Sequence, residues 1–300
     1  MEKPFSKQTG SISIKEKQKK AMELWDNCIL CPRFCRVNRS SKEKGQCGAN
    51  NRIALASYGP HFGEENPLTG FRGSGAIFFM HCNLECVFCQ NWTISRGIEK
   101  GEEISTSELS SIMLQLQERG CHNINLVTPT PYIPLILDAL AEAVEKGLSI
   151  PLVYNCGGYE NPSTLKLLEG IVDIYLPDAK YFDQVIAQQY SGVNDYPQYL
   201  QKSLKEMHRQ VGDLKIDQRG IAYRGLLVRH LVLPNSLAGT PNLTTMLSRE
   251  VSPSCAINVM DQYYPAYQAK KYTDLSRTLS HKEFRQAIES VQKEGLRIIN

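Results

Sequence analysis

The sequence has no apolar run that approaches the roughly 20 residues needed to span a membrane as a helix. Residues 1–7 are polar and contain no apolar core of the kind found in signal peptides. The net charge is only +3 and the isoelectric point is about 8.3, so the charge balance does not indicate a nucleic-acid partner. Internal repeats and low-complexity segments are absent as well. We therefore expect a globular protein that uses neither a membrane nor a nucleic acid as its partner.

Cysteine, by contrast, is abundant. The chain of 300 residues has ten cysteines, and seven of them fall into two groups whose spacings are typical of metal ligands. Such groups predict metal binding rather than a disulfide framework. Because a reducing compartment keeps thiols free for metals, we expect the protein to be cytoplasmic.

The first group is Cys82, Cys86 and Cys89, spaced C-x3-C-x2-C. Three thiolates on one loop can hold three irons of a [4Fe-4S] cluster and leave the fourth iron open to another ligand. A closed zinc site would need a fourth ligand, and His81 is poorly placed because it is adjacent to Cys82. The apolar run 75–80 predicts a buried strand before this loop, and ligands bind at such strand ends in α/β folds. Three structural cysteines without a metal are the alternative.

The second group precedes the first and has four members: Cys28, Cys31, Cys35 and Cys47. Four thiolates suit either zinc in a closed site or an auxiliary iron–sulfur cluster. The spacing does not distinguish these two metal centres, and a structural role without metal is the third possibility.

The remainder of the chain alternates strand and helix signals, which predicts parallel βαβ units with right-handed crossovers. A tail over 1–12, a helix over 14–25 and a short strand over 53–58 come first. We expect an N-terminal extension with the four-cysteine cluster over 1–70 and a barrel-like domain over 71–300. Predicted strands are 75–80, 123–127, 152–154, 172–176, 225–233 and 256–260, and predicted helices are 106–117, 134–145, 162–168, 183–189, 197–211, 240–247 and 281–294.

The loop 82–89, with Phe88 before Cys89, resembles the signature of the radical S-adenosylmethionine (SAM) superfamily. The longer string from Phe79 to Trp92 is similar to the pyruvate formate-lyase activating enzymes, and within them to the PflX-like branch. The resemblance extends over about residues 28–267. It implies a partial (β/α)6 TIM-like barrel of radical SAM type, with a [4Fe-4S] cluster and SAM as cofactors.

Four residues match SAM-contacting positions of these activating enzymes. Asn155 stands where they have an aspartate, and Asp178 and Lys180 match a pair that serves the SAM carboxylate and a neighbouring cation. Arg229 matches an arginine that lines the SAM site. Simpler alternatives are a tight turn at 155–159 and a solvent-exposed ion pair at 178–180.

Two further positions qualify this match. Thr130 stands where relatives carry a glutamate for the SAM amine, and a hydroxyl supplies no charge there. His230 points to the opposite face of the strand from Arg229, so we expect a core histidine.

The resemblance implies an oxidoreductase that cleaves SAM reductively to methionine and a 5′-deoxyadenosyl radical. An electron donor such as flavodoxin or ferredoxin would supply the electron, and a glycine Cα of a glycyl-radical enzyme would lose the hydrogen atom. A small molecule, a peptide or another protein side chain is the alternative substrate. A non-enzymatic metal-binding module is the third hypothesis, and the barrel pattern argues against it. We expect a laterally open barrel, but an N-terminal cysteine unit over its mouth would favour a small ligand.

Overall fold

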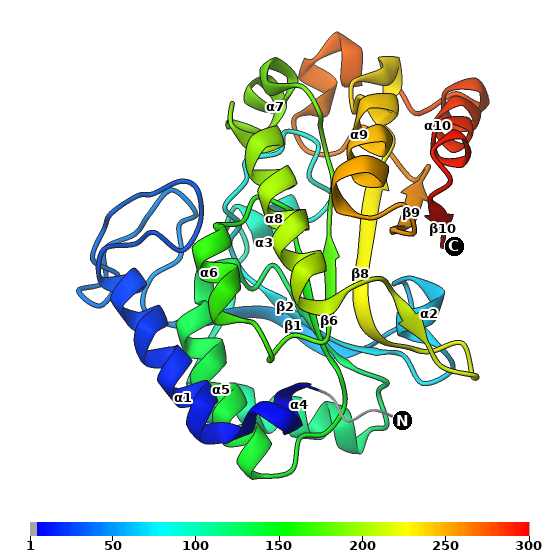
Figure 1. The fold of residues 1–300 in the computed structure, drawn as a ribbon. Helices are drawn as coiled ribbons and strands as arrows, with labels where there is room; N and C mark the ends of the chain where they lie inside the picture. Colours follow the sequence, from blue (N-terminus) through cyan, green and yellow to red (C-terminus); the bar gives the residue numbers. More distant parts are fainter. Residues whose placement is uncertain (1–4, 300) are drawn as a thin grey trace.

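The computed structural model describes residues 5–299, with side chains described from residue 13 onward. The first helix, α1 (Phe5–Asp26), packs along α5 (Ile133–Glu145) (Figure 1). It buries Ile14, Ala21 and Trp25, which recur on one helical face. The predicted tail over 1–12 is therefore wrong from Phe5 on, because the helix extends backwards, and residues 1–4 lie outside the described residues.

All six predicted strands form, and they pair in parallel in the order β2-β4-β5-β6-β8-β9. Short strands extend both ends of this sheet. β1 and then β3 continue it antiparallel beyond β2, and β10 pairs in parallel with β9. Within residues 5–299 the two ends of the sheet do not pair with each other, so the sheet is a partial barrel, as predicted. The strands are β1 (Ile53–His61), β2 (Ser74–Phe79), β3 (Glu102–Ile104), β4 (Ile124–Val127), β5 (Leu152–Cys156), β6 (Ile174–Pro177), β7 (Lys215–Ile216), β8 (Ala222–Leu231), β9 (Ala256–Met260) and β10 (Arg297–Ile298).

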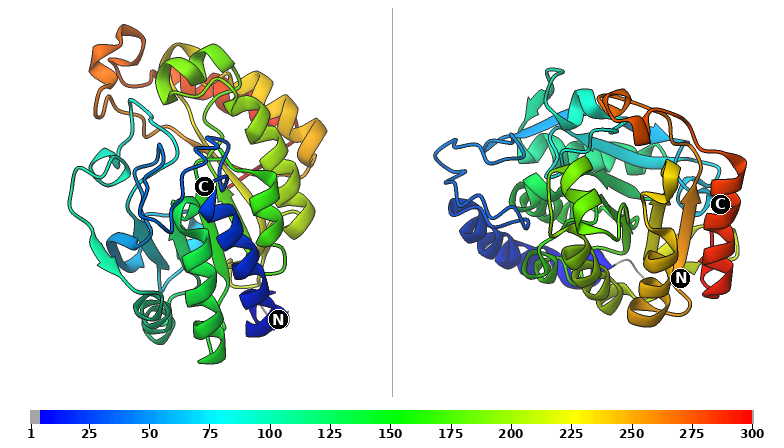
Figure 2. Two further views of the ribbon diagram at one scale, coloured as in Figure 1. Left: turned by 90° about the vertical axis from the view of Figure 1, so that its left-hand side faces the viewer. Right: turned by 90° about the horizontal axis from the view of Figure 1, so that it is seen from above.

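The helices lie in an arc around the outer side of the sheet when the molecule is seen from above (Figure 2). Local signals explain where two of them begin. Ser105 and Ser280 each start a capping box with a glutamate three residues later, which satisfies free backbone N–H groups of the first turn. The remaining helices are α2 (Asn66–Thr69), α3 (Trp92–Ser95), α4 (Thr106–Glu118), α6 (Pro162–Leu167), α7 (Gln184–Ser191), α8 (Tyr196–Val211), α9 (Thr240–Met246) and α10 (His281–Lys293).

The two faces of the sheet differ in character. Alternate strand residues point to opposite faces, so Tyr154 packs in the large core beneath the helices while Val153 packs in a small inner core. Leu68 of α2 packs in the same inner core. Towards the carboxyl ends of the strands, the inner-facing positions become polar, and Arg229 of β8 lies beside Asn258 of β9. The sheet therefore presents a polar inner surface on the side where the cysteine loop follows β2.

The loop that carries the four N-terminal cysteines lies at one side of the molecule, beyond the end of α1 (Figure 1). It is attached to the loop 82–89: Arg33 donates through Nε to the carbonyl oxygen of Asn83 at 2.9 Å, and Gln46 donates to Glu85 at 3.0 Å. None of the helices within residues 5–299 is long and apolar enough to cross a membrane.

Candidate functional site

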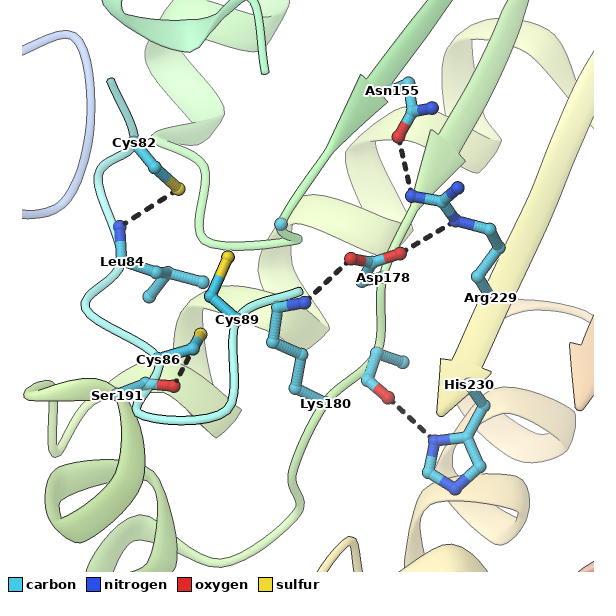
Figure 3. A network of polar contacts seen from close by, with 12 residues as sticks. Cys82, Leu84, Cys86, Cys89, Asn155, Asp178, Lys180, Ser191, Arg229 and His230 are labelled. Atoms are coloured by element: carbon cyan, nitrogen blue, oxygen red, sulfur yellow. Dashed lines mark hydrogen bonds and ion pairs between the residues drawn. The ribbon is translucent and has the colours of Figure 1, made fainter. Parts of the chain in front are cut away.

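The loop Cys82–Cys89 leaves the carboxyl end of β2 through a sharp turn at His81, whose φ is 71°. Its sulfurs each have a polar neighbour. The Leu84 N–H donates to Cys82 Sγ at 3.4 Å, and the Ser191 hydroxyl donates to Cys86 Sγ at 2.9 Å (Figure 3). Cys89 Sγ lies 3.4 Å from the Ser95 hydroxyl. Hydrogen bonds of this kind to sulfur are among the features by which proteins tune iron–sulfur clusters.

The loop is buried enough to change its acid–base behaviour. Burial, together with the neighbouring thiol of Cys86, raises the pKa of the Cys82 thiol to about 12. Burial also raises the pKa of Cys86, while the positive charge of Lys180 opposes this shift. A metal that binds here must displace the thiol protons, and a nearby cation favours the resulting thiolates.

The three thiols suit a cluster better than a single ion. Across residues 5–299 no three His, Cys, Asp or Glu side chains converge closely enough to hold one metal ion. In a [4Fe-4S] cluster each thiolate binds a different iron, so the sulfurs need not converge on one point. The donor set and its neighbours therefore fit this cluster.

The four predicted SAM-contacting residues come together in one network beside this loop (Figure 3). Arg229 donates through Nε to Asp178 Oδ1 at 2.8 Å and through Nη2 to Asn155 Oδ1 at 2.7 Å. Lys180 Nζ donates to the other oxygen of Asp178 at 2.7 Å. The Lys180 and Asp178 side chains are only 18% and 21% exposed, so this ion pair is largely shielded from solvent.

The charges in this network hold one another ionised. Burial opposes ionisation of Asp178, but Arg229 and Lys180 outweigh it and keep the pKa of this carboxyl below its usual value. Burial would lower the pKa of Lys180, yet the Asp178 carboxylate raises it well above its usual value. The network thus presents a fixed ammonium group next to the cysteine loop.

Glu64 is part of the same network, although the sequence analysis did not identify it. Its Oε2 lies 3.3 Å from Arg229 Nη1, and its Oε1 accepts a long hydrogen bond of 3.4 Å from Asn155. Burial raises the pKa of Glu64 to about 7, against the charge of Arg229. Glu65 beside it accepts from Asn258 Nδ2 at 3.0 Å. No sequence signal marks these residues, because they precede α2 in an irregular segment that reaches the polar inner face only in the folded chain.

Thr130 does not face this network. Its hydroxyl donates to Glu160 Oε1 at 2.9 Å and accepts from the Tyr154 hydroxyl at 3.2 Å, in a separate buried cluster. Gly158, in the expected tight turn, has a φ of 75°, and a Cβ there would collide with the carbonyl oxygen of Asp178. Glycine is therefore needed for backbone packing at this turn.

His230 is a core residue, as predicted. Its side chain is fully buried and points away from Asp178 and Arg229 (Figure 3). Its Nδ1 lies 2.7 Å from the Ala179 carbonyl oxygen and its Nε2 lies 2.9 Å from the Thr240 hydroxyl. Both ring nitrogens are thus satisfied within the protein.

The four N-terminal cysteines lie near one another. Burial raises the pKa of Cys31, and the thiols of Cys47 and Cys28 add to this effect. Cys47 responds in the same way to burial, with Cys28 and Cys35 among its neighbours. The loop is closed by a hydrogen bond of 2.9 Å from the Cys28 N–H to the Val37 carbonyl oxygen. The donor set is compatible with a soft metal, although the thiols are not gathered around a single point.

Comparisons with known proteins agree with this site. A model of the radical SAM superfamily matches residues 77–213, which include the cysteine loop, Asn155, Asp178 and Lys180. An uncharacterised protein of Methanocaldococcus jannaschii, MJ0674, is 32% identical over 292 residues, which cover 93% of this chain and 78% of that protein. The chain belongs to the radical SAM superfamily. Membership implies a [4Fe-4S] cluster and SAM as cofactors of this radical SAM protein.

Two further matches are more distant. A second uncharacterised M. jannaschii protein, MJ0808, is 26% identical over 157 residues, or 47% of this chain and 46% of that protein. The structure of SuiB of Streptococcus suis bound to the precursor peptide SuiA matches with a TM-score of 0.50 and 16% identity. That match covers 73% of this radical SAM protein but only 46% of SuiB, and it shows a shared fold.

Proposed function

We propose that the protein is a radical SAM enzyme in which Cys82, Cys86 and Cys89 hold the [4Fe-4S] cluster and the adjacent polar network binds SAM. When bound, these cofactors supply reductive cleavage of SAM to methionine and a 5′-deoxyadenosyl radical. The observation that carries this proposal is the position of Lys180. Its ammonium group is bonded to Asp178 and lies close enough to Cys86 for each to shift the other's pKa.

Each polar residue of the network has a distinct part in this proposal. Lys180 is a point charge suited to the SAM carboxylate. Asp178 holds Lys180 in place, and Arg229 in turn orients Asp178 from the neighbouring strand. Asn155 bonds Arg229 from the other side, where it fixes the plane of the guanidinium. Ser191 supports the thiolate of Cys86 with its hydroxyl.

For the substrate we propose a glycine Cα of a glycyl-radical enzyme, as in the pyruvate formate-lyase activating enzymes and their PflX-like branch. The string from Phe79 to Trp92 supports this proposal. Flavodoxin or ferredoxin is the proposed electron donor.

Contacts around the cysteine loop favour the alternative, a small molecule or a peptide. The N-terminal unit bonds the loop at Asn83 and Glu85, and on another side the Gln268 N–H donates to the Val87 carbonyl oxygen at 2.9 Å. Trp92 and Tyr267 also stack there, with ring centroids 5.2 Å apart. Because segments from both ends of the chain contact the loop, a folded partner has less room to approach it.

At the N-terminal unit we propose a second metal centre, zinc or an iron–sulfur cluster, on Cys28, Cys31, Cys35 and Cys47. The mutual influence of these thiols on one another's pKa supports it. Its role would be to support folding, since the unit is bonded to the side of the loop Cys82–Cys89.

Anaerobic reconstitution with iron and sulfide, followed by addition of SAM and dithionite, tests the enzyme assignment. We expect 5′-deoxyadenosine to accumulate, as measured by mass spectrometry. A protein that binds the cluster but forms none of this product would refute the proposed activity.

The substrate is tested by adding each glycyl-radical enzyme encoded in the same genome. A doublet in the electron spin resonance spectrum, assigned to a glycyl radical, supports activation of that partner. SAM cleavage without any such doublet across all candidates would exclude the activating role and leave a small molecule, a peptide or another protein side chain as the substrate.

A further inference from the structure

A large cavity opens at the end of the sheet opposite to the cysteine loop. Its volume is about 450 Å³, within the range of small-molecule sites. Several of the residues that line it precede or begin the parallel strands: Cys121 and His122 before β4, Pro151 before β5, Asp173 before β6, and Tyr223 in β8. We call this cavity the basal pocket.

The basal pocket is separate from the proposed SAM site. β8 runs from Tyr223 in the pocket to Arg229 in the polar network, and six residues of strand extend about 20 Å. The inner core, which includes Val153 and Leu227, occupies the space between the two ends. In barrel folds, chemistry collects at the carboxyl ends of the strands, so an open pocket at the amino ends needs a different explanation.

Positive charge predominates around the pocket. Its lining has three arginines against two aspartates, and Asp217 already pairs with Arg219 at 3.0 Å. Asp173 accepts a hydrogen bond of 2.9 Å from the Leu152 N–H. Arg72 pairs with no carboxylate anywhere in the part of the chain that the structure describes. Burial lowers the pKa of His122, and the charges of Arg219 and Arg72 lower it further, which reflects the same positive field.

An aromatic side chain forms the rim. Phe71 is 63% exposed, and its ring is held from two sides. The His122 ring meets it edge-on, with centroids 4.8 Å apart, and the Arg72 guanidinium lies over it at 5.4 Å from the ring centroid. The Arg72 side chain passes beside Gly120, whose φ of 84° favours glycine. The exposed ring and the unpaired cation are therefore positioned before any ligand arrives.

We propose that the basal pocket binds a small anion that carries a planar ring, with the anionic group on Arg72 and the ring against Phe71. A carboxylate or a phosphate can serve as the anionic group, because a guanidinium recognises both through paired N–H donors. The pocket walls of Ile150, Pro151 and Ile221 provide apolar surface for the ring. This assignment does not depend on the radical chemistry at the other end of the sheet.

The test is calorimetric titration of the full-length protein with phenyl phosphate, the simplest phosphate of this class. Benzoate is the carboxylate counterpart, GMP is a larger ring-bearing phosphate, and inorganic phosphate lacks a ring. We expect saturable binding of at least one ring-bearing anion, at least tenfold tighter than inorganic phosphate. The preferred probe then distinguishes a carboxylate ligand from a phosphate ligand.

Matched variants locate the binding. Arg72→Gln and Phe71→Ala should each weaken binding of the preferred probe about tenfold. Arg285→Gln removes the same charge at an exposed position of α10 and should leave this binding unchanged. Both pocket side chains are exposed, and thermal unfolding of each variant confirms that the fold is intact. Absence of saturable binding for every ring-bearing probe, or equal weakening by Arg72→Gln and Arg285→Gln, would overturn the proposal.

Discussion

The two cysteine groups of this protein use the same side chain in different surroundings. Cys82, Cys86 and Cys89 follow the end of a parallel strand and lie beside the ammonium group of Lys180. The N-terminal thiols lie beside one another and beside Arg39, whose guanidinium is stacked on Trp25 at 4.2 Å and donates to Cys28 Sγ at 4.0 Å. Arg39 also donates to the backbone carbonyl oxygens of Asn50 and Pro131, so its donors are used to hold the N-terminal loop in place, whereas Lys180 donates to a carboxylate at the strand ends. This contrast supports the proposal that the loop Cys82–Cys89 takes part in chemistry and that the N-terminal group supports folding.

The largest effect is expected when one thiol is removed from the loop Cys82–Cys89. Cys86→Ala should abolish cluster binding and 5′-deoxyadenosine formation, because two thiolates cannot hold the three irons. Iron content and product formation after anaerobic reconstitution measure both effects. Cys255→Ala is the control. Cys255 is buried, immediately precedes β9 and belongs to neither of the two cysteine groups. Continued product formation by Cys86→Ala would contradict the site assignment.

The N-terminal group is tested by the complementary variant. A protein with alanine at all three positions of the loop should still carry zinc or iron, because its four N-terminal thiols are unchanged. Metal analysis after anaerobic purification gives the result. No metal above background would mean that these thiols have no metal-binding role.

Lys180→Ala tests the network itself. We expect weaker SAM binding by about 1.5–3 kcal/mol, or tenfold to about a hundredfold, from loss of a charge-assisted contact. The cluster should remain, because Lys180 donates to Asp178 and not to a cysteine in this structure. Titration with SAM, alongside the absorbance of the cluster, separates the two effects. Unchanged SAM affinity would show that Lys180 has no part in binding.

The smallest expected effect concerns Glu64. In the unfolded chain this carboxyl ionises near 4.5, whereas in the folded protein it keeps its proton to about pH 7. The stability due to this proton is therefore fully present below pH 4.5 and is lost as the pH rises to about 7. The side chain of the Glu64→Gln variant does not titrate. The free energy of unfolding of the wild type should therefore fall relative to that of the variant across this window, on the order of 1–3 kcal/mol.

Urea unfolding of both proteins between pH 4.5 and 7 measures this difference in the free energy of unfolding. Glu99→Gln, at an exposed position, should show no such trend. A constant difference between wild type and Glu64→Gln across the window would mean that Glu64 is ionised in the folded protein throughout.

Much of the fold followed from local patterns. The strands at 74–79 and 256–260 and the helices after Ser105 and Ser280 have apolar runs or caps that act within a few residues. The short strands β3, β7 and β10 were missed, because two or three residues carry no recognisable period and pair only when a neighbouring strand is already in place. The sequence did not predict the helix over residues 5–12 for a related reason: a mostly polar segment shows no apolar face with helical spacing.

The sequence by itself determined the cysteine loop. Three thiols within eight residues can share a cluster through local backbone geometry, whatever the rest of the chain does. Only the tertiary structure decided what lies beside them. Arg229 meets Asp178 across 51 residues of chain and Glu64 across 165, and no local pattern records a contact between such distant positions. The parallel sheet makes these contacts by bringing its strand ends to one edge, where Arg229 bonds Asp178 and Asn155 from neighbouring strands.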